Sequence, residues 1–372
     1  MAVKVFYIIS DIEKALSFEW ITKGIDKTRF ELHFILLGKD DTPFISFLKG
    51  AAIPHYVILF RGKKDILKAW LKVFLILRKQ DPRIVHTHLY SSNLIGLSAA
   101  WCLRIPKRIY TRHHASIHHR YFPKTVYIDR IINFLSTDIV ALCDNLKEIL
   151  IKWEGVSPKK IHLIPNGFDL DYFESIDPIK VKALRMRYKI PDTAYPVVGV
   201  IARFTEWKGV QYCIPAFKAL LKEFPHAHLI LANATGDYAA RIKLMLDELP
   251  VGSYTTILFE EDSASLYKVF NVYVHTPIDS HAEAFGQTYV EALAGGVPSV
   301  FTLSGIACDF IRHKENALVV GYAQASEISG AVSQLLKDPA LQERLIRSGR
   351  ETIKERFSIH EMIRKMEELY VP

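Results

Sequence analysis

The chain of 372 residues has few cysteines and no long apolar run. Its four cysteines are scattered, form no Cys-x-x-Cys pair and are mostly flanked by apolar residues. We therefore expect buried free thiols rather than disulfides. The longest obvious apolar run, Val73–Leu77, is far shorter than the ~20 residues that cross a membrane. The chain opens on a strand pattern with no signal-peptide features, so we expect a cytoplasmic protein.

Glycine is missing where a dinucleotide-binding turn would need it. The segment that follows the first predicted strand, Ser10–Glu19, contains none, and the first glycine of the chain is Gly24. A Gly-x-Gly-x-x-Gly turn requires small residues at that place, because the backbone must approach a pyrophosphate closely. The sequence thus argues against a nicotinamide-dependent oxidoreductase.

Acidic residues are absent from residues 82–128, within a chain of net charge +8. The segment instead interleaves cations with aromatic residues. This composition predicts a basic surface for anionic lipid head groups, a polyprenyl diphosphate or an acidic polysaccharide, with a solvated basic face as the alternative. No nucleic-acid partner is expected, since no recognised binding motif accompanies the segment. The cations are Arg83, Arg104, Lys107, Arg108, Arg112, Arg120 and Lys124.

Apolar residues make up 49% of the chain, enough for the cores of two domains. Strand and helix patterns alternate in both halves, which predicts an α/β protein with two doubly wound parallel sheets. The predicted strands are Val3–Ile9, Phe30–Leu37, Tyr56–Phe60, Ile84–Thr87, Arg108–Thr111, Asp138–Leu142 and Lys160–Ile164, then Val197–Ile201, His228–Ala232, Thr255–Phe259, Val272–His275, Ser299–Thr302 and Ala317–Val319.

One predicted helix, Lys64–Lys79, is basic and carries Trp70, Phe74 and Leu77 at helical spacing. Such a helix either packs on its own sheet or lies in a membrane interface. We favour packing on the sheet and keep the interface as the competing interpretation.

Two cations follow the apolar strand Val197–Ile201. Arg203 stands just past its end, Lys208 five residues later, and Gly209 opens a helical pattern over Val210–Phe224. Ligands of open α/β sheets bind at the carboxyl ends of strands, and an Arg fork beside a Lys charge suits a pyrophosphate. Either cation alone would be read as a solvated surface charge.

Glu283 precedes a short predicted helix over Gln287–Ala294 that begins after Gly286, and Glu291 lies within this helix. The free N–H groups at a helix start favour a phosphate. A carboxylate beside such a site can accept hydrogen bonds from sugar hydroxyls, and Gly286 would let the backbone approach a ligand. The alternative is a surface helix with two solvated glutamates.

Together these stretches resemble the retaining family-4 nucleotide-sugar glycosyltransferases. The family's Glu-x7-Glu motif is matched by Glu283 and Glu291, and its Gly-Arg-x4-Lys-Gly motif by Ala202–Gly209, with Ala for the first Gly. Leu163-Ile-Pro-Asn-Gly-Phe-Asp169 and Arg83-Ile-Val-His-Thr-His88 are similar to two further family segments. The resemblance covers most of the chain.

The resemblance implies the GT-B fold, in which two Rossmann-like domains face a central cleft. The acceptor domain would span residues 1–175 with a crossover helix at 357–372, and the donor domain residues 176–356. The implied reaction moves a hexose, with retention, from a UDP- or GDP-sugar to a lipid-linked saccharide or cell-surface polysaccharide precursor. No cofactor and no obligatory metal are implied, and peripheral contact with an anionic inner membrane face is a further expectation.

The resemblance also assigns site residues. Arg203 and Lys208 would stabilise the departing diphosphate, Glu283 would hold the donor sugar, Glu291 the ribose, and His113 would lie near the transferred sugar. The donor-binding stretch would comprise Ala284, Phe285, Gly286, Gln287 and Thr288, while the acceptor side would include Ser10, Asp11, His88 and His114.

Four histidines, His113, His114, His118 and His119, also raise the question of a metal. We expect none, because no carboxylate or cysteine is close in sequence and adjacent loop histidines rarely share a tetrahedral site. Two alternatives to a transferase stay open: a GT-B nucleotide-sugar epimerase, and a non-catalytic basic module that binds membrane or polysaccharide.

Overall fold

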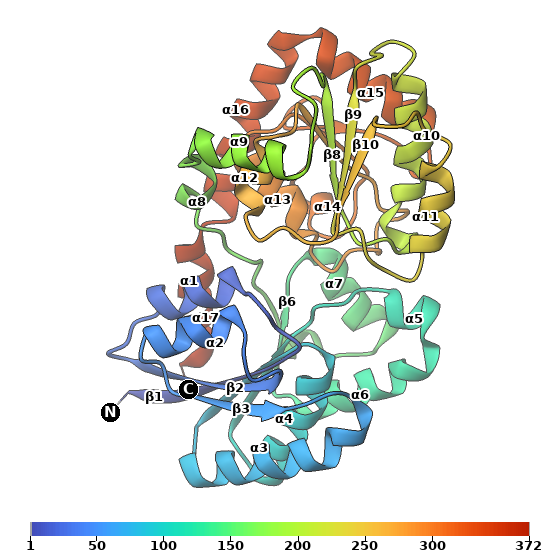
Figure 1. Ribbon diagram of the computed structural model, residues 1–372. Coiled ribbons are helices and arrows are strands. Elements are labelled where there is room, and N and C mark those ends of the chain that lie inside the picture. The colour runs from blue at the N-terminus through green and yellow to red at the C-terminus, as the bar shows by residue number, and fades with distance from the viewer. Residues whose placement is uncertain (1, 372) are drawn as a thin grey trace. The chain divides into compact units, whose positions relative to one another are not determined.

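The computed structural model describes residues 2–371 and divides into two compact units (Figure 1). The first unit comprises the chain up to Phe168 together with the segment from Ile359 onward, and the second is Asp169–Ser358. The sequence placed these boundaries at residues 175 and 357. The chain therefore enters the second unit once, leaves it once, and returns to the first.

The first unit is built on a parallel sheet of seven strands in the order β3-β2-β1-β4-β5-β6-β7. Its central strands are almost wholly buried, as continuous apolar runs require in a sheet covered on both faces. The strands are β1 (Val3–Ser10), β2 (Phe30–Gly38), β3 (His55–Leu59), β4 (Ile84–His88), β5 (Lys107–Thr111), β6 (Asp138–Ala141) and β7 (Ile161–Leu163).

Helices α3, α4 and α6 pack side by side on this unit, and α1 packs against α17. The main helices are α1 (Leu16–Gly24), α2 (Pro43–Gly50), α3 (Ile66–Gln80), α4 (Tyr90–Cys102), α5 (Ile117–Tyr121), α6 (Val126–Leu135), α7 (Asp144–Glu148) and α17 (Ile359–Tyr370).

Helix α3 buries one stripe and exposes another. Ala69, Val73 and Leu77 recur every four residues and pack into the core with the sheet, while Trp70 and Phe74 are half-buried at its border. The predicted packing of this helix on its own sheet is confirmed. The leucines of its other stripe face outward, so the packing of α3 does not test the competing interpretation of a membrane interface.

The second unit contains a parallel sheet of six strands in the order β10-β9-β8-β11-β12-β13. Its strands are β8 (Val197–Ile201), β9 (His228–Ala232), β10 (Tyr254–Ile257), β11 (Val272–His275), β12 (Ser299–Phe301) and β13 (Leu318–Val319). The helices are α8 (Asp171–Glu174), α9 (Pro178–Arg187), α10 (Val210–Leu220), α11 (Ala239–Leu246), α12 (Ser263–Tyr267), α13 (Gln287–Ala294), α14 (Ala307–Phe310), α15 (Ala325–Lys337) and α16 (Pro339–Arg356).

Each sheet has one place where the strand order reverses. In the first unit this switch point lies between β1 and β4, and in the second between β8 and β11. The connections from the two strands leave in opposite directions there, which opens a crevice beyond their carboxyl ends. The side chains that follow these four strands are therefore the first place to look for ligand-binding groups.

Helix α17 completes the core of the first unit. The buried Tyr370 hydroxyl lies 2.5 Å from the Tyr7 hydroxyl of β1 and 2.7 Å from Nδ1 of His86 on β4. His86 in turn bonds Thr111 of β5 through Nε2 at 2.9 Å. These contacts make His86 a core residue.

Two further sequence predictions meet the structure here. All four cysteines are free, as predicted, but only Cys143 and Cys213 are buried, whereas Cys102 is exposed and Cys308 is half-buried. Across residues 2–371 we find no helix with the length and apolar character needed to span a bilayer.

Candidate functional site

Three side chains meet at the switch point of the second unit. Lys208, from the turn after β8, places its Nζ 2.5 Å from Oε1 of Glu283. His275, the last residue of β11, places Nε2 3.0 Å from the same oxygen. Two predicted site residues, 75 positions apart in the chain, are thus brought into direct contact. His275 is a member of the site that the sequence prediction did not name.

A glycine explains how Lys208 reaches this position. Gly209 has a φ of +73° and begins α10, and a Cβ at this residue would lie 1.8 Å from the carbonyl oxygen of Thr276. The turn after β8 therefore rests directly on the backbone that leaves β11. No residue with a side chain fits there without moving one of the two segments.

The loop that carries Glu283 is held from behind by the segment after β12. The Glu283 N–H donates to Oγ of Ser304 at 3.0 Å, and the Ile306 N–H donates to the Phe285 carbonyl at 2.9 Å. A Cβ on Gly305, whose φ is +54°, would come within 2.9 Å of the Glu283 Cβ. The carboxylate is consequently fixed by backbone packing as well as by its ion pair.

Burial and charge oppose each other at Glu283, which is 7% exposed. Burial alone would raise the pKa of this carboxyl, but the Lys208 charge and the hydrogen bond from His275 outweigh it and hold the pKa far below its usual value. Glu283 is therefore a carboxylate at neutral pH. Burial lowers the pKa of His275 despite the neighbouring carboxylate, so its ring is neutral there.

Both partners of Glu283 use the same oxygen. Oε1 accepts from Lys208 and His275, whereas Oε2 accepts no hydrogen bond from residues 2–371. A buried carboxylate with one oxygen uncommitted retains lone pairs for an incoming donor. A hydroxyl group is the simplest such donor.

Glu291, at the second position of the Glu-x7-Glu pattern, is differently placed. It is 9% exposed, and its two oxygens accept from the Gln287 amide at 2.9 Å and the Tyr267 hydroxyl at 3.0 Å. Burial, only partly opposed by these bonds, raises the pKa of Glu291. The interpretation of Glu283 and Glu291 as solvated surface glutamates is therefore wrong.

Helix α13 begins and ends where the sequence predicted. Gly286 precedes it with a φ of +86°, and a Cβ there would lie 2.6 Å from the ring of Tyr289. The glycine is thus explained by the close packing of Tyr289, a reason that the sequence prediction did not include. Of the rest of the predicted donor stretch, Phe285 is buried, Ala284 and Thr288 are half-buried, and Gln287 is exposed at the helix start.

Arg203 is not part of the Lys208–Glu283 cluster. Its side chain is exposed and forms no hydrogen bond or ion pair within residues 2–371. It does stand directly after β8, at the carboxyl edge of the sheet. The structure therefore gathers Lys208, Glu283 and His275, and leaves Arg203 as a solvent-facing cation at the same edge.

The switch point of the first unit carries Ser10, Asp11 and His88. Ser10 Oγ lies 3.3 Å from Ser92 Oγ of α4, and Asp11 has a left-handed φ of +52°. Asp11 also lines a surface hollow of about 340 Å³, together with Gly38 at the end of β2. Three of the four predicted acceptor-side residues thus lie at or beside one switch point.

His113 joins this group from the end of β5. Its Nε2 lies 3.1 Å from Nδ1 of His88, while Nε2 of His88 is buried and has no hydrogen-bond partner within residues 2–371. Burial lowers the pKa of His113 to about 4 and that of His88 far below its usual value. Both rings are neutral at physiological pH, so each offers one donor and one acceptor nitrogen.

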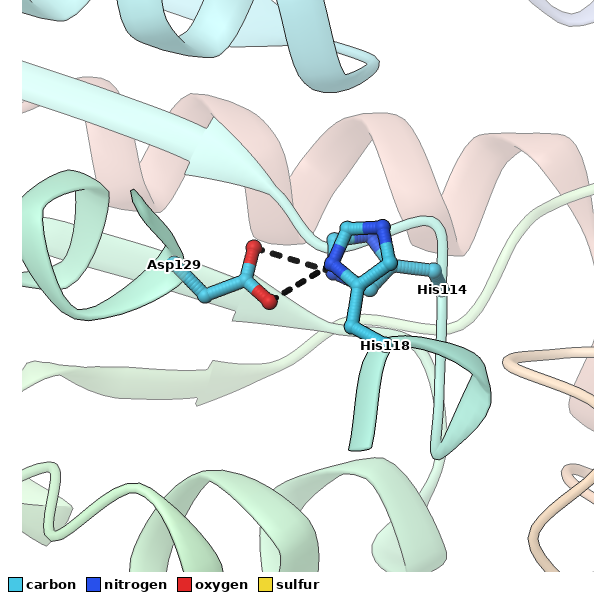
Figure 2. Close-up of side chains that lie close together, drawn as sticks. All are labelled: His114, His118 and Asp129. Carbon is cyan, nitrogen blue, oxygen red and sulfur yellow. Dashed lines mark hydrogen bonds and ion pairs between the residues drawn. The ribbon is translucent and has the colours of Figure 1, made fainter. Parts of the chain in front are cut away.

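His114, the fourth predicted acceptor-side residue, belongs to a separate cluster. Its Nε2 lies 3.2 Å from Oδ1 of Asp129, and Nδ1 of His118 lies 2.7 Å from Oδ2 of the same carboxylate, as Figure 2 shows. Arg112 approaches Asp129 at 3.3 Å and forms an ion pair with Glu154. All of these side chains are buried or nearly so.

This cluster corrects two sequence predictions. The expected basic surface of residues 82–128 is broken, because Arg112 is completely buried between two acids and Arg108 donates to the Leu135 and Ile105 carbonyls. The expectation that no carboxylate lies near the four histidines of residues 113–119 is also wrong. Asp129 lies 11 positions after His118 and reaches it because α5 and α6 fold back on one another.

Comparison with protein families matches residues 185–352 to glycosyl transferases group 1 and residues 21–172 to glycosyltransferase family 4. The capsular polysaccharide biosynthesis glycosyltransferase CapM of Staphylococcus aureus is 26% identical over 376 residues, which cover 94% of each chain. The 2-deoxystreptamine glucosyltransferase of Streptomyces kanamyceticus is 24% identical over 344 residues, or 87% of each chain.

Among solved structures, the Anabaena protein HepE in complex with UDP and glucose is similar to this chain with a TM-score of 0.82. The two are 19% identical, and the match covers 98% of each chain. At that identity the likeness concerns the fold. Together with the two sheets described above, it confirms the predicted fold class, GT-B with two Rossmann-like domains.

Proposed function

The chain belongs to the glycosyl transferases of group 1, and on that premise we propose a retaining enzyme that moves a hexose from a UDP- or GDP-sugar to a hydroxyl acceptor. The proposed acceptor is a lipid-linked saccharide or a cell-surface polysaccharide precursor. CapM, a relative over most of both chains, is named for capsular polysaccharide biosynthesis. Family membership removes the non-catalytic binding module as an alternative.

The observation that carries the proposal is the contact of Lys208, Glu283 and His275 at the switch point of the second sheet. A cation and an acid held together at the carboxyl edge of a parallel sheet suit a ligand with both phosphate and hydroxyl groups. A nucleotide sugar has both, and α13 starts four residues beyond Glu283.

Charge is the main difficulty of the reaction. The diphosphate gains negative charge as it departs, while the anomeric carbon becomes oxocarbenium-like. We assign Lys208, the exposed Arg203 and the N–H groups at the start of α13 to stabilise the departing diphosphate. Lys208 and the N–H groups of α13 are fixed before the substrate arrives, which lowers the reorganisation that the reaction requires.

Glu283 is assigned to hold the donor sugar. Its Oε2 has no partner within residues 2–371 and can accept from a sugar hydroxyl, while His275 and Lys208 fix the carboxylate through Oε1. Glu291 is assigned to the ribose hydroxyls. Because both its oxygens already accept one hydrogen bond, it would bind through its remaining lone pairs.

The first unit is assigned to the acceptor. The hollow beside Asp11 and the neutral His88–His113 pair supply polar groups at its switch point. His113 is proposed to bond the transferred sugar, and attack by the acceptor hydroxyl from the face of the departing phosphate gives retention. The donor chemistry is proposed to need no divalent metal, since cationic side chains take that role.

The test begins with binding and transfer. Thermal-shift screening against a panel of UDP- and GDP-sugars identifies the donor, and turnover is then measured with and without acceptor for Lys208→Ala and Glu283→Gln. We expect both variants to fold and to lose roughly 10²–10³ in turnover. Near-normal turnover in both variants would remove the assignment.

Epimerisation of the sugar without acceptor would show that the protein is an epimerase and not a transferase. Loss of activity with chelator, restored by Mg²⁺ or Mn²⁺ but not by Zn²⁺, would contradict metal-free donor chemistry.

We further propose that the first unit rests on an anionic membrane through its α3–α4–α6 layer. These neighbouring helices expose large apolar side chains, and lysines alternate with them on α3. Apolar insertion beside cations is the chemistry of a surface rich in anionic lipid. The exposed apolar residues are Leu67, Leu71 and Leu75 on α3, Trp101 on α4, and Tyr127, Ile131 and Phe134 on α6.

Vesicle co-sedimentation tests this surface. We expect binding to vesicles that contain phosphatidylglycerol and little binding to pure phosphatidylcholine, because the lysines contribute through charge. Leu71→Glu should reduce binding, whereas Leu244→Glu, at a residue of similar exposure on α11 of the second unit, should not. Equal binding by both variants would refute the assignment.

A further inference from the structure

We infer that His114, His118 and Asp129 form a binding site for a zinc-class divalent ion on the first unit. One ligand atom from each of the three residues lies within 4.8 Å of the others. This site is separate from the proposed donor site, which lies in the other unit, and it does not depend on the proposed function. Figure 2 shows the two imidazole rings directed at the one carboxylate.

The spacing of the ligands has a structural origin. His114 precedes α5 and His118 lies within it, four positions later, so the two rings come from the same side of one turn. Their centroids are 3.8 Å apart. A His-x3-His pair is a common way to present two nitrogens to zinc. Asp129 then reaches both from the first turn of α6.

The distances suit a small cation after minor side-chain rotation. Zinc ligands lie about 2.0–2.2 Å from the metal, which places ligand atoms in a tetrahedral site about 3.4 Å apart. The present separations from Asp129 oxygens are 3.2 Å to His114 and 2.7 Å to His118. An ion would replace the hydrogen bonds that now join these atoms, and the fourth position would stay open to water.

The charges of the cluster favour a bound cation. Asp129 and Glu154 contribute two negative charges, and Arg112 balances one of them. Arg112 directs Nη2 at Glu154 and Nε at the His114 carbonyl, whereas its Nη1, 3.3 Å from Asp129, makes no hydrogen bond. Asp129 is therefore only loosely held by the guanidinium. A second cation can take that carboxylate without breaking a well-aligned bond.

Nitrogen and carboxylate ligands in this ratio select borderline metals such as Zn²⁺ or Co²⁺ over Mg²⁺, which prefers oxygen. The ion would fasten the loop that carries His113 and His114 to α6. His119, next in the chain, has two buried ring nitrogens with no hydrogen-bond partner within the described residues, and its Nε2 lies 3.8 Å from Glu154.

The experiment is metal binding to tag-free, chelator-treated protein, measured by competition with a chromophoric zinc indicator. We expect one Zn²⁺ per chain, and with Co²⁺ the visible absorption of a four-coordinate site. His118→Ala should weaken binding roughly tenfold or more. The matched control is His162→Ala, which removes a histidine paired with Asp138 at 2.8 Å on the same unit and should bind as the wild type does.

A second measurement avoids any variant that fails to fold. Zinc should protect the peptide with His114 and His118 of the wild-type protein from modification by diethyl pyrocarbonate, and leave His162 reactive. Absence of stoichiometric binding in the wild type would overturn the inference, as would equal binding by a folded His118→Ala protein. In either case the cluster is a hydrogen-bonded brace between α5 and α6.

Discussion

The two switch points of this chain share a topology and differ in chemistry. In the second unit, a cation, an acid and an imidazole are joined through one carboxylate oxygen. In the first, the corresponding crevice holds the neutral pair His88 and His113, with no carboxylate bonded to either ring within residues 2–371. The reversal of strand order supplies a place for a ligand, and only the few side chains at the strand ends decide which ligand.

The difference in electrostatics follows from what is buried beside each histidine. In the first unit, burial pushes the pKa of His113 down to about 4. In the second, burial alone would raise the pKa of Glu283, but the charge of Lys208 outweighs it. The Lys208–Glu283 ion pair therefore persists. One crevice is thus suited to charged phosphates, and the other to neutral hydroxyl groups.

The largest expected effect sharpens this contrast at the charged crevice. Lys208→Ala should reduce turnover roughly 10²–10³-fold, because a preorganised cation is removed from the departing diphosphate. Lys218→Ala is the control, since Lys218 forms an exposed ion pair with Glu248 on the same unit. Steady-state rates at saturating donor measure the difference. Equal rates for the two variants would remove the distinction between the crevices.

Acid should weaken the first unit more than the second between pH 7 and 5, because burial lowers the pKa of its core histidines further than that of His275. The pKa of His86 is lowered to about 3 and that of His113 to about 4, from about 6.5 when unfolded. Between these values the unfolded state binds more protons, so the free energy of unfolding of the first unit falls as pH drops below about 6.5. At pH 5 each such ring would cost about 2 kcal/mol.

The contribution of Glu283 to the second unit has the same sign but a lower range. Its pKa is depressed, so its contribution is present above about pH 4.5 and is lost only as pH falls further. Hydrogen exchange, corrected for intrinsic rates, should show β4–β5 peptides losing protection between pH 7 and 5 more than β8–β11 peptides. Parallel loss in both units would contradict this prediction.

A smaller effect is expected from the neutral crevice. His113→Ala should lower kcat/KM for transfer about tenfold, since one hydrogen bond to a sugar hydroxyl is lost. Nucleotide affinity measured by calorimetry should be unchanged, because the proposed phosphate contacts belong to the other unit. A variant that binds nucleotide less tightly would show that the two crevices are not chemically separate.

The smallest effect on transfer is expected from the frame of the first crevice, meaning the core contacts of Tyr370 with Tyr7 and His86. Tyr370→Phe removes the hydroxyl that joins Tyr7 and His86, and should lower the free energy of unfolding of the first unit by about 1–2 kcal/mol. Urea denaturation followed by hydrogen exchange of β1 and β4 peptides measures it. Transfer should stay within a few-fold of wild type. A loss as large as that of Lys208→Ala would mean that the frame itself takes part in the reaction.

Much of the fold could be predicted from local pattern. The strands Val197–Ile201, His228–Ala232 and Val272–His275 and helix Gln287–Ala294 have the predicted bounds. Buried parallel strands leave continuous apolar runs, and a glycine marks the helix start. Helix α10 ends at Leu220 rather than Phe224, and hydrogen-bonded turns continue the chain from there to Phe224.

The site was only partly predictable, since long-range contacts leave no local signal. Lys208 and Glu283 were found by motif, but His275 was seen only as the end of a strand. Its position at the carboxyl end of β11 could have suggested it. The Asp129 cluster could not be predicted from sequence neighbours, because Asp129 lies 11 positions after His118 and meets it only through the fold.

The return of α17 to the first unit affects when that unit can fold during translation. The hydroxyl of Tyr370 contacts Tyr7 and His86, which are translated 363 and 284 residues earlier. Domains usually fold as they emerge from the ribosome, the earlier one first. Here the first unit cannot complete its core until the whole of the second unit has been translated.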